Sequence, residues 1–408
     1  MISYNEALNE VLKRAVPGLA VQVQLLDASG LVLAEPVTSR EDIPFTDNSA
    51  MDGYAVRFED IKNASSENPA VLELAGEVPA GKTYRGFLES GKAVAIYTGA
   101  PVPAGADTVV EIEVTEVKNG KVYVYAPREA GANIRKKGED VRSGETIFRE
   151  GTVVTPAVIG VLASIGKSTV RVYRPPVVAI ISTGSELVEI DDHLYPGAVR
   201  NSNTYLLEAL LKELPVGVIN YGTVVDDLTQ IKLVLSEAAQ KADVILTTGG
   251  VSLGDYDLVK IAIEELKFKR VFWQVAQKPG KPLAFYEKEE GKVYVFGLPG
   301  NPAAVHICYL EYVRPFLLKT LGYESYKPIR LRAKLKNGFR KKTGRLNFVR
   351  VSLFEEDGEL WAEKAGAQGS GVLSTSARSN AIALIPAEAE EVRHGEEVDI
   401  HYFSSLGW

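Results

Sequence analysis

Glycines and carboxylates stand close together in the stretch VILTTGGVSLGDYDLVK, Val244–Lys260. After an apolar run the stretch carries Gly249, Gly250, Ser252 and Gly254, then Asp255 and Asp257. Backbone N–H groups of such a loop can close on phosphate oxygens at the positive end of a following helix. Carboxylates beside a phosphate repel it unless a divalent cation lies between them. Such a loop could hold a phosphate together with a cation, but a Gly-Gly pair after a strand is by itself more often a plain turn.

Other loops that follow predicted strands carry groups suited to the same site. They contain Glu186 in STGSEL, Asp226 and Asp227 in VVDD, and Pro299, Asn301 and Pro302 in GLPGNPAAV. We expect Asn301 to cap a helix that has Pro302 at its first position, which would make a second anion site. Ligands of open α/β sheets bind at the carboxyl ends of the strands, so these loops should converge on one edge. It is this convergence that favours a site for phosphate and a divalent cation.

A basic turn and an acidic turn are further candidates. Lys278 and Lys281 flank the Pro-Gly pair of QKPGKP, so both ammonium groups can point into one pocket; solvated surface lysines are the alternative. Asp52 lies in DNSAMDGYAV, where making the turn would itself explain an Asp-Gly pair. Cys308 lies in a helical pattern and is predicted to be a small buried hydrophobe, and the histidines lack ligand spacing.

The elements that must position these residues form a multidomain α/β plus β fold. From Pro175 onward, strand-like runs such as VVAIIS and DVILTTGG alternate with helical runs such as LTQIKLVLSEAAQ, which predicts a parallel sheet with helices on both faces. The β-rich N-terminal part contains Asn119-Gly120 between alternating runs, a hairpin signal. The predicted domains are a non-contiguous module of 1–22 and 138–174, a β-rich domain over 23–137, an α/β domain over 175–325, and a small C-terminal β-barrel over 326–408.

Composition excludes several classes of function. The chain has 408 residues, of which 46% are hydrophobic and 24% charged, as in soluble multidomain proteins. Its net charge of -7 argues against a nucleic-acid partner. The first residues predict an amphipathic helix with a capping box from Ser3 to Glu6, and no apolar run reaches membrane-spanning length, so we expect a cytoplasmic protein without a membrane partner. The glycine spacings fit neither P-loop kinases nor Rossmann dehydrogenases.

Several long motifs, in this order, resemble the MoeA family of molybdopterin molybdenumtransferases, which is related to the E domains of gephyrin and its plant counterpart. They are NSAMDGYAV, YTGAPVPAGADTVVEIE, GANIRKKGEDV, ISTGSEL, TTGGVSLGDYD, KPGKPLAF and GLPGNPAA. The resemblance spans nearly the whole chain. It implies a homodimer and a molybdopterin-binding α/β domain. The implied reaction converts adenylylated molybdopterin and molybdate, or tungstate, into molybdenum cofactor and AMP with the help of Mg²⁺, with a molybdopterin adenylyltransferase and cofactor-accepting enzymes as partners.

The same resemblance implies roles for individual residues. The implied catalytic residues are Asp52, Thr98, Glu186, Asp226 and Asp257. The implied substrate-binding residues are Gly249, Gly250, Ser252, Gly254, Pro299, Asn301 and Pro302. The implied molybdate ligands are Lys278, Lys281, Arg345 in TGRLNF, and Ser370 in AQGSG. Asp226 and Asp257 are implied to hold Mg²⁺, with Asp255 as the alternative ligand. Asp52 and Thr98 are implied to line the cleft across the dimer interface.

Other positions match the family without an assigned role, or depart from it. Arg135 and Asp140 match a family cluster whose role the residues do not reveal. Gln274 and Ala304 stand where the family often has Lys and Ser, which removes two anion donors. Two other functions fit parts of the chain: adenylyl transfer to molybdopterin, and a non-catalytic dimeric scaffold of the gephyrin type. The β-rich domains with Asp52 favour metal insertion over the first, and the complete set of carboxylates and lysines favours catalysis over the second.

Overall fold

The computed structural model describes residues 1–250, 258–290 and 292–403, which form two compact units. The first unit contains Met1–Ala34, Gly151–Pro156 and Thr169–Trp408, and the second contains Glu35–Glu150 and Ala157–Ser168. The division into four domains stays a prediction.

A mostly parallel sheet forms the centre of the first unit. Its strands, in spatial order, are β16 (Gly217–Val224), β13 (Val177–Thr183), β17 (Val244–Thr248), β21 (Val293–Leu298), β20 (Ala284–Lys288) and β18 (Lys269–Trp273). The strands from β16 to β21 are parallel, as the sequence predicts, whereas β20 and β18 add an antiparallel edge. The sequence did not predict that edge, because charged residues begin the short run of β18 and end that of β20.

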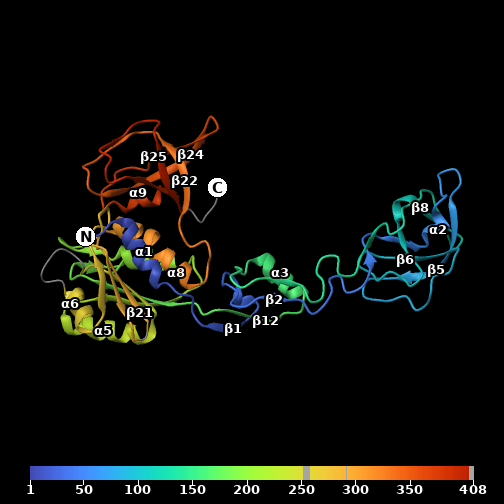
Figure 1. Ribbon diagram of the computed structural model, residues 1–408, viewed down its shortest axis with the longest axis horizontal. Helices are drawn as coiled ribbons and strands as arrows, with labels where there is room; N and C mark the ends of the chain where they lie inside the picture. Colours follow the sequence, from blue (N-terminus) through green and yellow to red (C-terminus); the bar gives the residue numbers. More distant parts are fainter. Residues whose placement is uncertain (251–257, 291, 404–408) are drawn as a thin grey trace. The chain divides into compact units, whose positions relative to one another are not determined.

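Helices cover both faces of this sheet. They are α1 (Tyr4–Arg14), α4 (Ser202–Leu211), α5 (Leu228–Lys241), α6 (Leu258–Glu265), α7 (Pro302–Cys308), the π-helix η3 (Tyr309–Val313) and α8 (Arg314–Thr320). Successive strand residues point to opposite faces, so Val178 and Ile180 of β13 pack with α1 and α4 while Ala179 and Ile181 pack with α5 and α6. Figure 1 shows α5 and α6 on one side of β21 and α1 and α8 on the other. This layering leaves the ends of the strands free to carry the functional loops.

The C-terminal part of the first unit is a closed β-barrel, which confirms the prediction. Its elements are β22 (Ile329–Leu335), β23 (Phe339–Arg340), β24 (Leu346–Glu356), β25 (Glu359–Lys364), α9 (Leu373–Ala377), β26 (Ala381–Ile385), β27 (Glu391–Val392) and β28 (Glu397–Tyr402). The order β24-β25-β22-β28-β26 closes because β26 pairs back to β24. The short strand β19 (Gln277–Lys278) joins the barrel by pairing with β24. The basic QKPGKP turn therefore lies against the barrel.

The second unit is built around a sheet of order β7-β4-β6-β5-β9-β8. Its elements are β2 (Val37–Thr38), β3 (Asn48–Ser49), β4 (Gly53–Val56), α2 (Phe58–Ile61), β5 (Ala70–Val78), β6 (Lys92–Ile96), β7 (Thr108–Glu111), η2 (Ile112–Val114), β8 (Thr115–Lys118), β9 (Lys121–Val124), β10 (Ile134–Arg135), β11 (Thr146–Phe148) and α3 (Pro156–Ser164). The predicted hairpin is confirmed: β8 and β9 pair antiparallel across Asn119 and Gly120, and both turn residues have positive φ.

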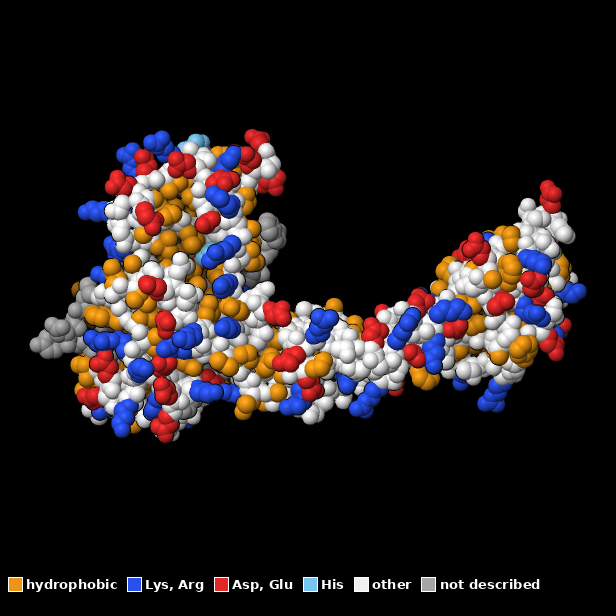
Figure 2. Space-filling model, in the orientation of Figure 1, with side chains coloured by type: hydrophobic (Ala, Val, Ile, Leu, Met, Phe, Trp, Pro, Cys, Tyr) orange, Lys and Arg blue, Asp and Glu red, His pale blue; other side chains and the backbone are white. Residues whose placement is uncertain are grey.

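The remaining short elements belong to the first unit. They are β1 (Ala20–Gln24), η1 (Leu26–Ala28), β12 (Thr169–Tyr173), β14 (Leu187–Val188) and β15 (Val199–Arg200). The predicted capping box of α1 is confirmed, since Ser3 and Glu6 bond reciprocally. Within the described residues, no helix combines the length and the apolar character needed to cross a bilayer. Figure 2 shows basic and acidic side chains interleaved over the visible face.

His306 in α7 is a buried imidazole that should make stability depend on pH. Burial and the positive charge of Arg350 lower the pKa of His306 to about 4. A histidine in the unfolded chain has a pKa of about 6.5, so as the pH falls the unfolded state takes up a proton before the folded state does. The contribution of neutral His306 to the free energy of unfolding is therefore complete above about pH 6.5, and about 3 kcal/mol of that free energy is lost by pH 4. From about pH 7 to pH 5, we expect the Tm of the wild type to fall further than that of His306→Leu; parallel falls would contradict this.

Candidate functional site

The residues assigned to an oxyanion line one pocket between the α/β sheet and the barrel. The pocket encloses about 230 Å³, and Lys278, Lys281, Arg345 and Ser370 all belong to its lining. Its described lining contains no carboxylate. Three cations around a concave site without a counter-charge create a strongly positive potential. We call this cavity the cationic pocket.

Arg345 is presented by a loop whose backbone is fixed on both sides. The ammonium of Lys341 donates to the carbonyls of Arg345 and Ala387, each at 3.1 Å. The amide of Leu346 donates to the carbonyl of Ala276 at 3.0 Å. Through these two bonds Lys341 braces the loop, and burial lowers the pKa of its ammonium. Arg345 is the residue of this loop that belongs to the described lining of the pocket.

A buried arginine holds the backbone of the loop that carries Ser370. Arg350 is only 1% exposed and donates to the carbonyls of Gly369 at 3.0 Å and Val372 at 2.9 Å. From the α/β side, Asn301 Nδ2 donates to Ser370 Oγ at 3.1 Å. Because the Ser370 oxygen accepts this bond, its own proton is free to be donated to a ligand oxygen.

The structure corrects the expected role of Asn301. It stands at the N-cap position of α7 with Pro302 in the first turn, but its side chain makes no capping bond because it reaches across to Ser370. The amide of Ala303 in turn donates to the carbonyl of Ser370 at 3.1 Å. The first turn of α7 is therefore partly occupied by the barrel loop, and it is not a fully open anion site as predicted.

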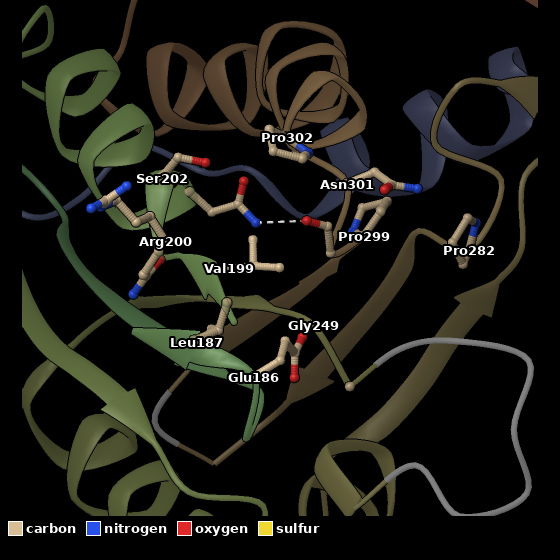
Figure 3. Close-up of a pocket in the computed structure, with 14 residues that line it drawn as sticks. Glu186, Leu187, Val199, Arg200, Ser202, Gly249, Pro282, Pro299, Asn301 and Pro302 are labelled. Atoms are coloured by element: carbon tan, nitrogen blue, oxygen red, sulfur yellow. Dashed lines mark hydrogen bonds between the residues drawn. The ribbon is translucent and has the colours of Figure 1, made fainter. Parts of the chain in front are cut away.

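A second, larger cavity of about 430 Å³ adjoins the cationic pocket. The predicted residues in its lining are Glu186, Gly249, Gly250, Pro299, Asn301 and Pro302. Pro282, Pro299 and Asn301 line both cavities. Figure 3 shows Glu186 and Gly249 from the strand-end loops on one side, with Asn301 and Pro302 at the start of α7 on the other. We call this cavity the loop pocket; the predicted ligands Ser252 and Gly254 lie outside the described residues.

Positions 249 and 250 accept only glycine in this structure. Their φ angles are +84° and +62°. A Cβ on Gly249 would stand 2.4 Å from the carbonyl oxygen of Thr183, and one on Gly250 would stand 2.3 Å from Cγ2 of Val259. The backbone therefore lies directly against β13 and α6, which leaves its edge bare toward the loop pocket.

The carboxylates come from the loops after β13 and β16. Asp226 accepts a hydrogen bond from the Ser185 amide at 2.9 Å, which places it beside the Glu186 loop. Asp227 instead caps α5 through the Gln230 amide at 2.9 Å. Among the described residues, no group of three or more His, Cys, Asp or Glu is close enough to hold a metal. Asp255 and Asp257 lie outside the described residues, so Asp226 is the described member of the predicted Mg²⁺ pair.

Asp52 and Thr98 lie together in the second unit. Oδ1 of Asp52 accepts from the Thr98 amide at 2.7 Å and from the Thr98 hydroxyl at 2.9 Å. These donors lower the pKa of Asp52, which keeps this exposed carboxylate ionised. Arg135 and Asp140 are also exposed residues of the second unit. Asp52 and Thr98, which come from two separate motifs, thus form one hydrogen-bonded pair, which is more than a turn at Asp52 requires.

Several pocket residues were missed from the sequence. They are Arg200, Asn201, Ser202 and Asn203 in the loop pocket, and Gln277 and Gln368 in the cationic pocket. Asn203 fixes the pocket wall by donating to the Gly300 carbonyl at 2.8 Å, the dashed line in Figure 3. The signal was the polar run RNSN ahead of an apolar helix, since Asn201 caps α4. Of the two departures from the family, Ala304 lines the cationic pocket, whereas Gln274 belongs to neither lining.

Comparisons with known proteins match this chain over nearly its whole length. Residues 2–166 match the MoeA N-terminal region (domain I and II), 179–319 a probable molybdopterin binding domain, and 332–403 the MoeA C-terminal region (domain IV). Molybdopterin molybdenumtransferases from a Nostoc species and from Bacillus subtilis are 38% and 35% identical, covering 92% and 98% of this chain and 87% and 93% of theirs. The crystal structure of the molybdopterin biosynthesis moeA protein from Pyrococcus horikoshii is 33% identical, with a TM-score of 0.81 over 99% of this chain and 100% of that one.

Proposed function

Because the chain belongs to the MoeA family, we propose that it is a molybdopterin molybdenumtransferase, which inserts molybdate or tungstate into adenylylated molybdopterin and releases AMP. The observation that carries the proposal is the pair of adjoining cavities. One is lined by cations and a hydroxyl, and the other by a bare glycine loop and the start of α7. A tetrahedral dianion fits the first and a phosphate-bearing pterin the second, so the two reactants would meet at Pro282, Pro299 and Asn301.

The cationic pocket would bind molybdate by charge and by geometry. Lys278 and Lys281 supply point charges, and Arg345 adds a planar group with several donors. Ser370 contributes a hydroxyl whose proton is free because Asn301 already occupies its oxygen as donor. Holding the dianion against the wall shared with the loop pocket orients it toward the bound pterin.

The loop pocket would bind the adenylylated molybdopterin. The edge of Gly249 and Gly250 can approach the phosphate oxygens because no Cβ stands in the way. Asp226 would hold Mg²⁺ together with Asp257, and carboxylate oxygens are the ligands this ion prefers. When bound, Mg²⁺ supplies positive charge that offsets the charge on the phosphoanhydride. The described residues fit this role in donor type, and Asp226 keeps one carboxylate oxygen beyond the bond from Ser185.

We also infer a homodimer in which the Asp52 and Thr98 pair of one copy serves the site of the other, as the family resemblance implies. A molybdopterin adenylyltransferase would supply the substrate, and cofactor-accepting enzymes would take the product. An ionised Asp52 with fixed orientation suits a site that handles a cation or a developing positive charge.

The test is whether the purified protein releases AMP from adenylylated molybdopterin only when molybdate is added. We expect AMP and molybdenum cofactor to appear together and to require both molybdate and Mg²⁺. Release of AMP that ignores molybdate would contradict the proposal. Formation of adenylylated molybdopterin from ATP would instead identify an adenylyltransferase, and absence of any turnover with intact substrate binding would identify a scaffold.

A further inference from the structure

Gln277 lies next to Lys278 and pairs with the strand that follows Arg345, so it is close in the backbone to the cations of the cationic pocket. Its backbone pairs with Leu346 and that of Lys278 pairs with Asn347, so the β19–β24 ladder sets the spacing between Lys278 and Arg345. Its side chain is 0% exposed and points beneath the turn that leads to Lys281.

The side-chain amide of Gln277 holds that turn by its carbonyls. Nε2 donates to the carbonyl oxygens of Pro279 at 3.2 Å and Gly280 at 3.4 Å, and Sγ of Cys308 lies within reach of the same nitrogen at 3.8 Å. Proline has no N–H, so the Pro279 peptide cannot brace the turn from its own nitrogen. The buried amide takes over this bracing.

Tyr312 in η3 fixes the orientation of this amide. Its hydroxyl donates to Oε1 of Gln277, and the hydroxyl is fully buried. Burial raises the pKa of Tyr312 far above its ordinary value, so the hydroxyl keeps its proton and remains a donor. Because carbonyl oxygens only accept, Nε2 must face the turn and Oε1 must face Tyr312. The reverse orientation of the amide would leave buried acceptors facing each other.

The turn packs tightly against the side chains beneath it. A Cβ on Gly280, whose φ is +91°, would stand 2.6 Å from both Nε2 of Gln277 and Sγ of Cys308. Tyr312 is itself packed edge-on against Tyr4 at 5.6 Å. The Tyr4 hydroxyl donates to Glu311 at 2.7 Å, so the support extends into α1. Rigid support of this kind is what preorganises a ligand site.

We propose that Gln277, locked by Tyr312, is the positioning residue that sets Lys278 and Lys281 against Arg345 for oxyanion binding. The proposal rests on the proposed function, because it concerns the same pocket. Neither side chain needs to touch the oxyanion, since Gln277 acts through the turn and Tyr312 acts through Gln277. Loosening the pair should weaken molybdate binding and leave the loop pocket unaffected.

Tyr312→Phe and Tyr309→Phe form a matched pair for the test. Both tyrosines lie in η3 and are 0% exposed, and both donate one buried hydrogen bond, but Tyr309 donates to the Leu210 carbonyl at 3.0 Å, away from the turn. Each variant therefore loses one buried hydroxyl and comparable stability. We expect Tyr312→Phe to raise the molybdate concentration for half-maximal AMP release about fivefold, and Gln277→Met to raise it at least about tenfold.

The control Tyr309→Phe should leave this concentration unchanged. In all three variants, the half-saturating concentration of adenylylated molybdopterin and the rate at saturating molybdate should stay within about twofold of the wild type. Calorimetric binding of tungstate should weaken in parallel. Equal molybdate dependence of Tyr312→Phe and Tyr309→Phe would overturn the positioning role alone. A wild type that neither binds tungstate nor needs molybdate would overturn the proposed function as well.

Discussion

Arg345→Ala raises the molybdate concentration required for half-maximal cofactor formation by about 10- to 100-fold, which is the loss expected for charge-assisted hydrogen bonds. Arg345 faces a pocket with no acidic residue in its described lining, and its loop is braced by Lys341 and by the Leu346 amide. Removing the guanidinium therefore removes a ligand without removing the support of the loop. Half-saturation by adenylylated molybdopterin should hold, because that substrate binds in the loop pocket.

Two further variants make this prediction specific. Arg345→Lys keeps the charge but loses the planar fork of donors, so we expect an intermediate rise. Arg340→Ala removes an arginine from the same barrel, where it pairs with Glu391 and its side chain is 82% exposed. This control should change neither half-saturation point, since exposed ion pairs contribute little. If Arg345→Ala and Arg340→Ala behave alike, molybdate binds elsewhere.

Local sequence patterns predicted the elements of the fold well. The capping box of α1, the hairpin at Asn119-Gly120 and the strands of the parallel sheet each depend on residues close together in the chain. The antiparallel strands β18 and β20 were missed because charged residues at one end leave each with only a short apolar run. The prediction that the Asn301 side chain caps α7 was wrong, because this side chain bonds to Ser370, which comes from a distant part of the sequence.

The sequence predicted several of the residues that line the candidate site, but it did not predict the buried contacts that hold those residues in place. The motifs brought Lys278 and Arg345 to attention, but the short β19–β24 pairing that joins them leaves no local signal. Arg350 stands in an alternating strand, where an arginine ordinarily indicates a solvent-facing position. It is buried because carbonyls of the 367–372 loop converge on its guanidinium. Supports of this kind depend on tertiary contacts, so only the structure reveals them.

Asp226→Asn should lower the rate of AMP release by about 100-fold and raise the Mg²⁺ requirement, while binding of the pterin substrate is retained. Asn keeps an oxygen that accepts from the Ser185 amide, so the loop after β13 stays in place and only the charge is lost. The neighbour Asp227 provides the matched control. It caps α5 through the Gln230 amide, and Asn is an equally good N-cap, so Asp227→Asn should be nearly silent in both rate and stability. Equal rates in Asp226→Asn and the wild type would remove Asp226 from the cation site.

The same variant tests the inferred dimer. The Asp52 and Thr98 pair lies in the second unit, whereas Asp226 and both pockets belong to the first. If each site takes Asp52 from one copy and Asp226 from the other, a hybrid of Asp52→Ala with Asp226→Asn contains one site that has lost both residues and one that is intact. Random exchange of equal amounts makes half of the dimers hybrid, so the mixture should recover about a quarter of the wild-type activity. If each chain instead supplies both residues to its own site, every site in the hybrid lacks one of them and no activity returns once exchange of subunits is demonstrated.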